Sequence, residues 1–81
     1  MMTIFEALAD PTRRQILDLL RERPRAVGEL TDLLKISQPG VSKQLRVLRE
    51  VGLVNVRQDA QRRWYELDSR PLSQVESWLA N

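Results

Sequence analysis

Residues 36–48 have the sequence ISQPGVSKQLRVL, and this stretch decides the fold. Ser37 is a residue type that caps helix N-termini, and Pro39 falls within the first turn that would follow, where its missing N–H costs little. The apolar side chains recur at the i, i+4, i+7 spacing of a buried helical stripe: Val41, Leu45 and Leu48. The stretch therefore predicts a short amphipathic helix that begins just after Ser37.

The other side of this predicted helix carries small or cationic side chains: Ser42, Lys43 and Arg46. Such side chains suit contacts with phosphates and base edges in a DNA major groove, where a helix-turn-helix inserts its second helix. The alternative is an ordinary solvated face, but this face has no acidic residue before Glu50. We therefore assign the three residues to DNA contact. The residues at the start of the helix are also assigned to DNA contact: Ser37, which is chiefly a cap, Gln38 and Pro39. Gln44 lies toward the side of the helix, and DNA contact and a structural role are balanced there.

Further helices are predicted on both sides of this stretch. Asp10 and Pro11 form an N-cap followed by a proline at the first helical position, and Pro24 ends the helix that they open. The predicted helices cover residues 1–8, 11–22, 26–35, 38 to about 51, and 71–81. The third of them has an apolar stripe that comprises Val27, Leu30, Leu33 and Leu34.

Two arginines, Arg13 and Arg14, lie at the start of the second predicted helix, where cations oppose the helix dipole. This placement predicts either a partner outside the domain or an ion pair with Asp10. A structural role is favoured over contact with a phosphate.

The period of the pattern changes after Gly52, a natural residue for the C-terminal end of a helix. Strand-forming residues within 53–56 and 63–67 predict two strands, and the polar residues 58–61 predict the turn between them. A helix-turn-helix followed by a hairpin is a winged helix. We therefore predict a mainly α fold with a small antiparallel β-hairpin: one winged helix-turn-helix domain over residues 1–81.

The predicted hairpin, or wing, carries three cations: Arg57, Arg62 and Arg63. Cations at a hairpin can protect an edge strand from mispairing, but three around one tip favour contact with phosphates or a minor groove. Adjacent strand residues point to opposite faces, so Arg62 is preferred over Arg63 for DNA contact. Of Trp64 and Tyr65, one is expected to pack in the core and the other to lie over the wing, rather than both stacking on bases.

Charge and composition exclude several classes of site. The formal net charge is +2, but residues 37–65 contain six cations and only two anions, which is the distribution expected of a nucleic-acid-binding protein. The chain has no cysteine and no histidine, so we expect no disulfide, no metal site, no cofactor and no catalytic residues. The sequence has neither an apolar run of membrane-spanning length nor a signal sequence, which predicts a cytoplasmic protein.

Both ends of the chain carry apolar stripes at helical spacing. They comprise Ile4, Phe5, Leu8, Leu72, Val75, Trp78 and Leu79. The alternative is that both stripes close the core of the monomer, but a domain this small has little core to cover. We therefore expect the helices at residues 1–9 and 71–81 to form a twofold dimer interface, which would place two recognition helices about one DNA turn apart.

Three segments resemble the ArsR family of bacterial winged-helix repressors. They are LADPTRRQIL at residues 8–17; VGEL, SQPGVSKQL and LREVGLV within residues 27–54; and Arg57 followed by RRWYEL at residues 62–67. The resemblance implies a homodimeric repressor on a pseudo-palindromic DNA operator, with release of DNA on metal binding in many members.

The chain departs from that family pattern at its metal site. Thr31 and Leu33 stand where the family's thiolate motif has cysteines, and the histidines of its second metal site are also absent. The first segment most resembles the metal-independent branch, and the small-molecule effector is left open. Gln44 stands where the family usually has histidine, so an operator sequence cannot be transferred from relatives.

The sequence thus predicts a sequence-specific double-stranded DNA-binding transcriptional regulator, most simply a dimeric repressor that occludes a promoter. The main alternative is a winged helix used as a protein-interaction module. Such modules tend to lose the cations of the recognition helix and wing, which this chain keeps. A single-strand or RNA binder would bind without preference for duplex. No constellation of residues supports an enzyme.

Overall fold

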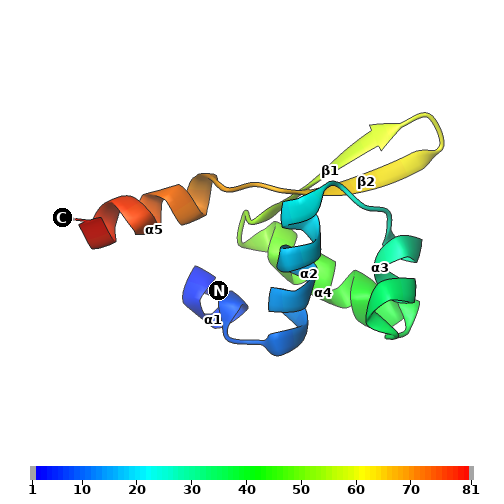
Figure 1. Cartoon of the computed structure of the whole chain (residues 1–81), viewed down its shortest axis with the longest axis horizontal. Helices are drawn as coiled ribbons and strands as arrows, with labels where there is room; N and C mark the ends of the chain where they lie inside the picture. Colours follow the sequence, from blue (N-terminus) through cyan, green and yellow to red (C-terminus); the bar gives the residue numbers. More distant parts are fainter. Residues whose placement is uncertain (1, 81) are drawn as a thin grey trace.

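The structure, a computed structural model, describes residues 2–80. Its elements follow in the order α1 (Ile4–Leu8), α2 (Pro11–Glu22), α3 (Val27–Leu34), α4 (Gln38–Glu50), β1 (Val54–Asp59), β2 (Arg62–Leu67) and α5 (Arg70–Ala80) (Figure 1). The two strands form an antiparallel hairpin directly after α4. The predicted winged helix-turn-helix fold is therefore confirmed.

The helix starts follow from their capping residues. Asp10 Oδ2 accepts a hydrogen bond from the backbone N–H of Arg13 at 2.9 Å, and Ser37 Oγ accepts one from the N–H of Gly40 at 3.3 Å. Both caps satisfy N–H groups that the helix itself leaves unpaired. The predicted starts of α2 and α4 are thereby confirmed.

The first helix begins later than predicted. Thr3 and Glu6 form a capping box, in which each side chain accepts a hydrogen bond from the backbone N–H of the other at 3.0 and 3.1 Å. This reciprocal cap fixes the start of α1 at Ile4, whereas the sequence pattern placed it at Met1. Met1 and Asn81 lie outside the described residues.

One residue of the predicted α3 stripe was assigned wrongly. Leu30 is fully buried, but Leu33 is 53% exposed. Val27, Leu30 and Leu34 share one arc of the helix, and Leu33 lies to one side of it, where no neighbouring element covers it. Three apolar residues therefore suffice to attach this short helix to the core.

The hairpin turn is tighter than predicted. The strands pair from Val54 with Leu67 to Asp59 with Arg62, so only two residues, Ala60 and Gln61, connect them. Ala60 has a positive φ of 56°. Residues 58 and 59, predicted as turn, belong to β1 because the ladder of hydrogen bonds continues to the tip.

The core lies between the helices and the base of the hairpin. Its largest fully buried side chains come from α2, α3, α4 and the link to β1, namely Ile16, Leu30, Val41, Leu45, Leu48 and Leu53. Tyr65 of β2 joins them, and its backbone exchanges two hydrogen bonds with Arg25 at 2.8 and 2.9 Å. These bonds anchor the hairpin to the helices.

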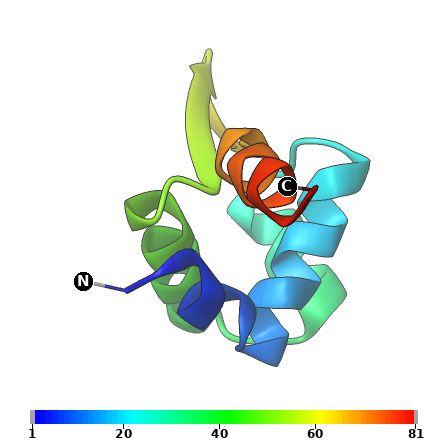
Figure 2. The ribbon, with the colours of Figure 1, turned by 90° about the vertical axis from the view of Figure 1, so that its left-hand side faces the viewer.

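The molecule is elongated, with principal extents of 42, 25 and 24 Å. The hairpin tip and α5 reach out at opposite ends, and α1 lies at the same end as α5 (Figure 1, Figure 2). Among the described residues, no helix has both the length and the apolar character needed to cross a membrane.

Candidate nucleic-acid interface

The outer face of α4 is formed by residues that the sequence assigned to DNA. Ser42, Lys43 and Arg46 are exposed, whereas the apolar stripe of the same helix, which begins at Val41, is buried. With Pro39, these three residues line a shallow hollow along the outside of the helix. The buried stripe thus fixes the rotation of α4, and the cations point outward.

The start of α4 combines a cap with an exposed edge. Ser37 Oγ is engaged by the N–H of Gly40, so Ser37 is a cap, and Gln38 and Pro39 are exposed beside it. Sequence reasoning missed Gly40: a Cβ built at this position would lie 3.0 Å from Ile36 Cγ2 and 3.2 Å from Ser37 Oγ. Glycine lets the turn between α3 and α4 close tightly onto the first turn of α4.

Gln44 is engaged by an arginine from another helix. It is half-buried, and its Oε1 accepts a hydrogen bond from Nη1 of Arg13 at 3.0 Å. The other donors of Arg13 reach the carbonyl oxygens of Ala7 at 2.9 Å and Glu6 at 3.1 Å. The predicted structural role of Arg13 is confirmed, but the predicted ion pair with Asp10 is wrong, because the Asp10 carboxylate accepts the backbone N–H instead.

The wing divides its cations between two faces. The register places Arg57 opposite Trp64, and Arg62 lies over the Trp64 ring at 5.5 Å from its centroid, so these three share the outer face. Arg63 lies over Tyr65 at 5.9 Å on the face that continues into the core. The expected split of Trp64 and Tyr65 between wing and core is confirmed.

The wing cations also differ in how far they are neutralised. Arg57 lies 3.8 Å from a carboxylate oxygen of Glu66 and 3.9 Å from one of Asp59. Arg62 and Arg63 have no such partner among the described residues. The wing cations without an ion pair are therefore those near its tip, where Arg62 lies opposite Asp59 in the strand register.

A polar hollow lies between α4 and the β1 strand of the wing. Its lining comprises Arg46, Arg49, Glu50, Val54, Asn55 and Val56. Sequence reasoning did not select Arg49, although it lies one turn beyond Arg46 on the same exposed side of α4. The spacing of three residues between the two arginines was the available signal.

The residues assigned to the dimer interface fall into two groups. Phe5, Trp78 and Leu79 are 64, 72 and 69% exposed, which is unusual for large apolar side chains. By contrast, Ile4, Leu8 and Leu72 pack in part against the monomer's own core. Part of each stripe thus packs within the monomer and part is exposed, and the dimer interface stays a prediction.

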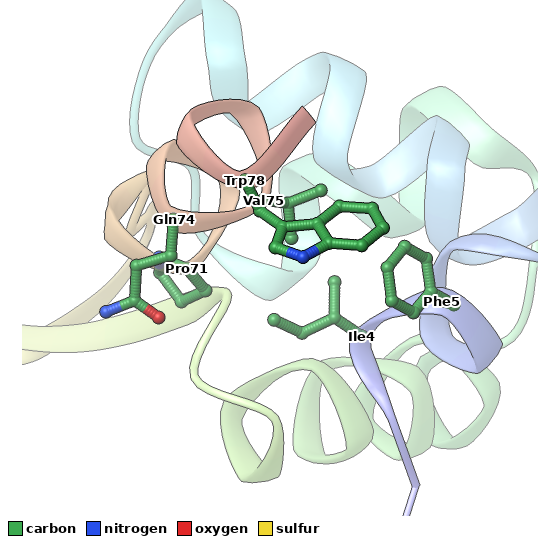
Figure 3. Close-up of a pocket in the computed structure, with 6 residues that line it drawn as sticks. All are labelled: Ile4, Phe5, Pro71, Gln74, Val75 and Trp78. Carbon is green, nitrogen blue, oxygen red and sulfur yellow. The ribbon is translucent and has the colours of Figure 1, made fainter. Parts of the chain in front are cut away.

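Between α1 and α5 lies an apolar pocket of about 270 Å³ (Figure 3). Ile4 and Phe5 line it from α1, and Pro71, Gln74, Val75 and Trp78 line it from α5. The close-up shows the indole ring of Trp78 directed from α5 toward the ring of Phe5 on α1. No residue of α5 is fully buried, and beyond the half-buried Leu72 and Val75 its apolar side chains Trp78 and Leu79 are exposed in the isolated chain.

The link between the wing and α5 is held by a carboxylate. Asp68 is buried, and it accepts hydrogen bonds from the side chain of Arg70 at 2.6 to 3.1 Å and from Asn55 Nδ2 at 3.1 Å. The Arg70 guanidinium and backbone N–H, ahead of the Asn55 amide, hold the pKa of Asp68 well below its usual value. The contact sets where α5 leaves the hairpin.

Among residues 2–80, no cluster of three or more carboxylate, histidine or cysteine side chains could hold a metal ion. The chemistry that this surface offers is that of cations, hydroxyls and amides. These groups donate hydrogen bonds to phosphate oxygens and base edges.

Comparisons with known proteins agree with this geometry. Residues 10–56 match the sequence profile of the family described as bacterial regulatory protein, arsR family. The transcriptional repressor SdpR of Bacillus subtilis is 32% identical over 81 residues, which is all of this chain and 90% of SdpR. The transcriptional activator HlyU of Vibrio cholerae is 41% identical over 68 residues, 84% of this chain and 63% of HlyU.

Solved structures share the whole architecture. HlyU from Vibrio cholerae superposes with a TM-score of 0.80 at 38% identity, over 94% of this chain and 83% of that one. An ArsR-like transcriptional regulator from Rhodococcus sp. RHA1 superposes with a TM-score of 0.90 at 27% identity, over 95% of this chain and 71% of that one. The similarity therefore extends beyond the helix-turn-helix to the wing and the terminal helices.

Proposed function

Because the chain belongs to the ArsR family of bacterial regulatory proteins, it is a DNA-binding regulator of transcription, and we propose that it works as a dimeric repressor. The dimer binds a pseudo-palindromic operator and occludes the promoter. Its place of action is the bacterial cytoplasm, where the chromosome lies.

The observation that carries this proposal is the outer face of α4. Its exposed side chains offer hydroxyl, ammonium and guanidinium donors, and neither Lys43 nor Arg46 forms an ion pair among the described residues. The cations of the wing tip extend the same positive surface. Contacts to base edges by Ser42, Lys43 and Arg46 supply sequence choice. Contacts to phosphates from Gln38, Arg62 and the helix start supply salt-dependent affinity.

The dimer rests on the exposed apolar residues of α1 and α5. Burying Phe5, Trp78 and Leu79 against a second copy removes a large apolar surface from water. A twofold axis through these helices gives two copies of α4 facing the same side of a duplex, about one helical turn apart.

Repression is supported by the name of the relative SdpR, whereas HlyU is named an activator. The two modes differ in where the operator lies. A dimer that covers the sites of polymerase contact represses by exclusion alone and needs no further surface.

The first experiment is sedimentation velocity of the protein with and without a labelled duplex, at two salt concentrations. The duplex is recovered by the wild-type protein from a randomised library. We expect a dimer that binds this duplex, resists an excess of random DNA and weakens as salt rises. A monomer with no preference for duplex would contradict the proposal and favour a protein-interaction module.

Whether the bound dimer represses is decided by transcription in vitro. The recovered operator is placed either over the promoter or upstream of it. Occlusion predicts loss of transcript only when the operator overlaps the promoter. An increase of transcript from the upstream position would contradict repression and indicate an activator.

A further inference from the structure

Arg13 holds two elements at once, as described above. Its guanidinium reaches two backbone carbonyls at the end of α1 and the side-chain oxygen of Gln44, 31 residues away on α4. Among the described residues, it is the one side chain whose hydrogen bonds join α1 to the recognition helix. The backbone of Arg13 is held as well, because its N–H donates a hydrogen bond to the capping carboxylate of Asp10.

The position of this cation has a physical reason. At the start of α2 a guanidinium opposes the helix dipole, but at the end of α1 it faces carbonyls of the last turn and the favourable end of that dipole. One of these carbonyls, that of Glu6, also accepts the backbone N–H of Ala9 at 3.2 Å. α1 has only five residues, so its last carbonyls lie close together within reach of one side chain. Three acceptors around one planar fork leave Arg13 little freedom to move.

This contact fixes the orientation of the Gln44 amide. A guanidinium has donors only, so the amide atom that faces it must be the oxygen. The amide nitrogen is then directed away from Arg13, and it has no protein acceptor in the part of the chain that the structure describes. Gln44 therefore presents a donor next to the exposed Lys43.

We propose that Arg13 is a positioning residue for DNA binding, which holds Gln44 so that its amide nitrogen donates a hydrogen bond to DNA. The proposal rests on the proposed function. With its oxygen engaged by Arg13, Gln44 is a donor to a phosphate oxygen or to a base acceptor. The bidentate pairing with adenine, which needs the amide oxygen as well, is disfavoured.

The test is a double-mutant cycle measured on operator affinity. Arg13→Gln and Gln44→Ala each remove one side of the contact, and each should weaken binding of the recovered operator by roughly fivefold, as expected for one hydrogen bond. If Arg13 acts through Gln44, the double variant is weakened no more than either single variant. If the fold loss of operator affinity in the double variant equalled the product of the two single losses, the proposal would be overturned.

A matched control separates positioning from loss of charge. Arg14 is the next residue, is exposed, and lines a hollow with Leu8 and Leu72 on the α5 side. Arg14→Gln loses the same charge without touching Gln44, so its operator affinity should change less than twofold. Equal losses of operator affinity for Arg13→Gln and Arg14→Gln would show that the contact with Gln44 does not contribute to DNA binding.

The salt dependence of operator affinity distinguishes a positioning role of Arg13 from a direct contact between Arg13 and a phosphate. A positioning residue that touches no phosphate leaves the slope of log affinity against log salt unchanged. If Arg13 contacted a phosphate directly, its replacement would lower that slope by about 1, which would contradict the proposal.

Thermal denaturation of each variant shows whether it is folded. If Arg13→Gln is unfolded at the assay temperature, Arg13→Lys, which keeps the charge but cannot span three acceptors, takes its place in the cycle.

Comparing the operator with a random duplex shows whether the Gln44 amide donates to a phosphate or to a base. Equal weakening of Gln44→Ala on operator and random duplex identifies a phosphate, and weakening on the operator alone identifies a base. Failure of the wild-type protein to bind any duplex would refute the proposed function itself. Normal binding by every Arg13 and Gln44 variant would refute only this inference.

Discussion

Arg46 and Lys43 point outward from α4 because the buried stripe leaves them no other direction. The two cations differ in chemistry: a guanidinium can contact a guanine edge with two hydrogen bonds, whereas an ammonium is a point charge suited to a phosphate. Their different roles can therefore be separated by measurement.

Replacing Arg46 by Ala should cost about 1–3 kcal/mol of operator binding and relax sequence selectivity at one position. Replacing Lys43 by Ala should weaken all duplexes alike and lower the salt slope by about 1. Fluorescence anisotropy with operator and random duplexes at several salt concentrations measures both effects. Arg21→Ala, an exposed cation on α2 and on the α5 side, is the control and should change neither.

Two helical glycines offer an internal comparison. Gly28 in α3 has open space around its missing Cβ, whereas Gly40 in α4 faces Ile36 and Ser37 at 3.0 and 3.2 Å. In open space, alanine is the better helix former and lowers the entropy of the unfolded chain.

Gly28→Ala should therefore raise the free energy of unfolding by about 0.5–1 kcal/mol. Gly40→Ala should lower it by about 1 kcal/mol, because the new methyl group crowds the branched side chain of Ile36 and the capping hydroxyl. Urea denaturation followed by circular dichroism measures both. A stabilised Gly40→Ala variant would mean that the turn between α3 and α4 can relax.

At the scale of elements, caps decided boundaries that periodicity left imprecise. α2 and α4 begin where Asp10 and Ser37 predicted, because a cap residue is a local signal. The start of α1 was misplaced because the capping box of Thr3 and Glu6 went unrecognised, although both residues are visible in the sequence. The length of the hairpin turn depended on strand pairing, which no local pattern specifies.

The joint between β2 and α5 depends on the ionised form of Asp68. Since hydrogen bonds from Arg70 lower the pKa of Asp68 below its ordinary value of 3.8, the folded state binds fewer protons at this site than the unfolded state. The stability that Asp68 contributes is thus present above the unfolded pKa and is lost as the pH falls below it.

Asp68→Asn should therefore lower stability at pH 7 and make it fall less steeply between about pH 4 and pH 2 than in the wild type. Thermal midpoints across this pH range measure the effect. Glu76→Gln, which removes an exposed carboxylate from α5, is the matched control and should keep the wild-type slope. Parallel curves for Asp68→Asn and the wild type would show that the carboxylate does not stabilise the joint.

At the scale of the whole molecule, the chain has one core and one uncovered apolar end. Among residues 2–80, eleven apolar residues are buried together, while Phe5 of α1 and Trp78 and Leu79 of α5 remain exposed. A large aromatic side chain at the centre of an interface commonly contributes more than its neighbours. Trp78 lines the pocket between α1 and α5, and in the proposed dimer we expect it to take this position.

Trp78→Ala should raise the dimer dissociation constant more than tenfold, since truncation of such an aromatic costs about 2 kcal/mol or more. Sedimentation equilibrium measures it, and operator binding should become more dependent on protein concentration. Leu33→Ala, an exposed apolar residue on α3, is the control and should leave the dimer unchanged. An unaltered dissociation constant for Trp78→Ala would place the dimer interface elsewhere.

The sequence by itself determined the helices, the order of the elements and the outward row of cations on α4, because caps, prolines and apolar spacing act within a few residues. It also determined that Arg62 and Arg63 lie on opposite faces of the wing, because strand residues alternate. The tertiary structure alone decided that Leu33 stays uncovered and that Arg13 engages Gln44. Both depend on which elements meet, and contacts across 31 residues leave no periodic trace in the chain.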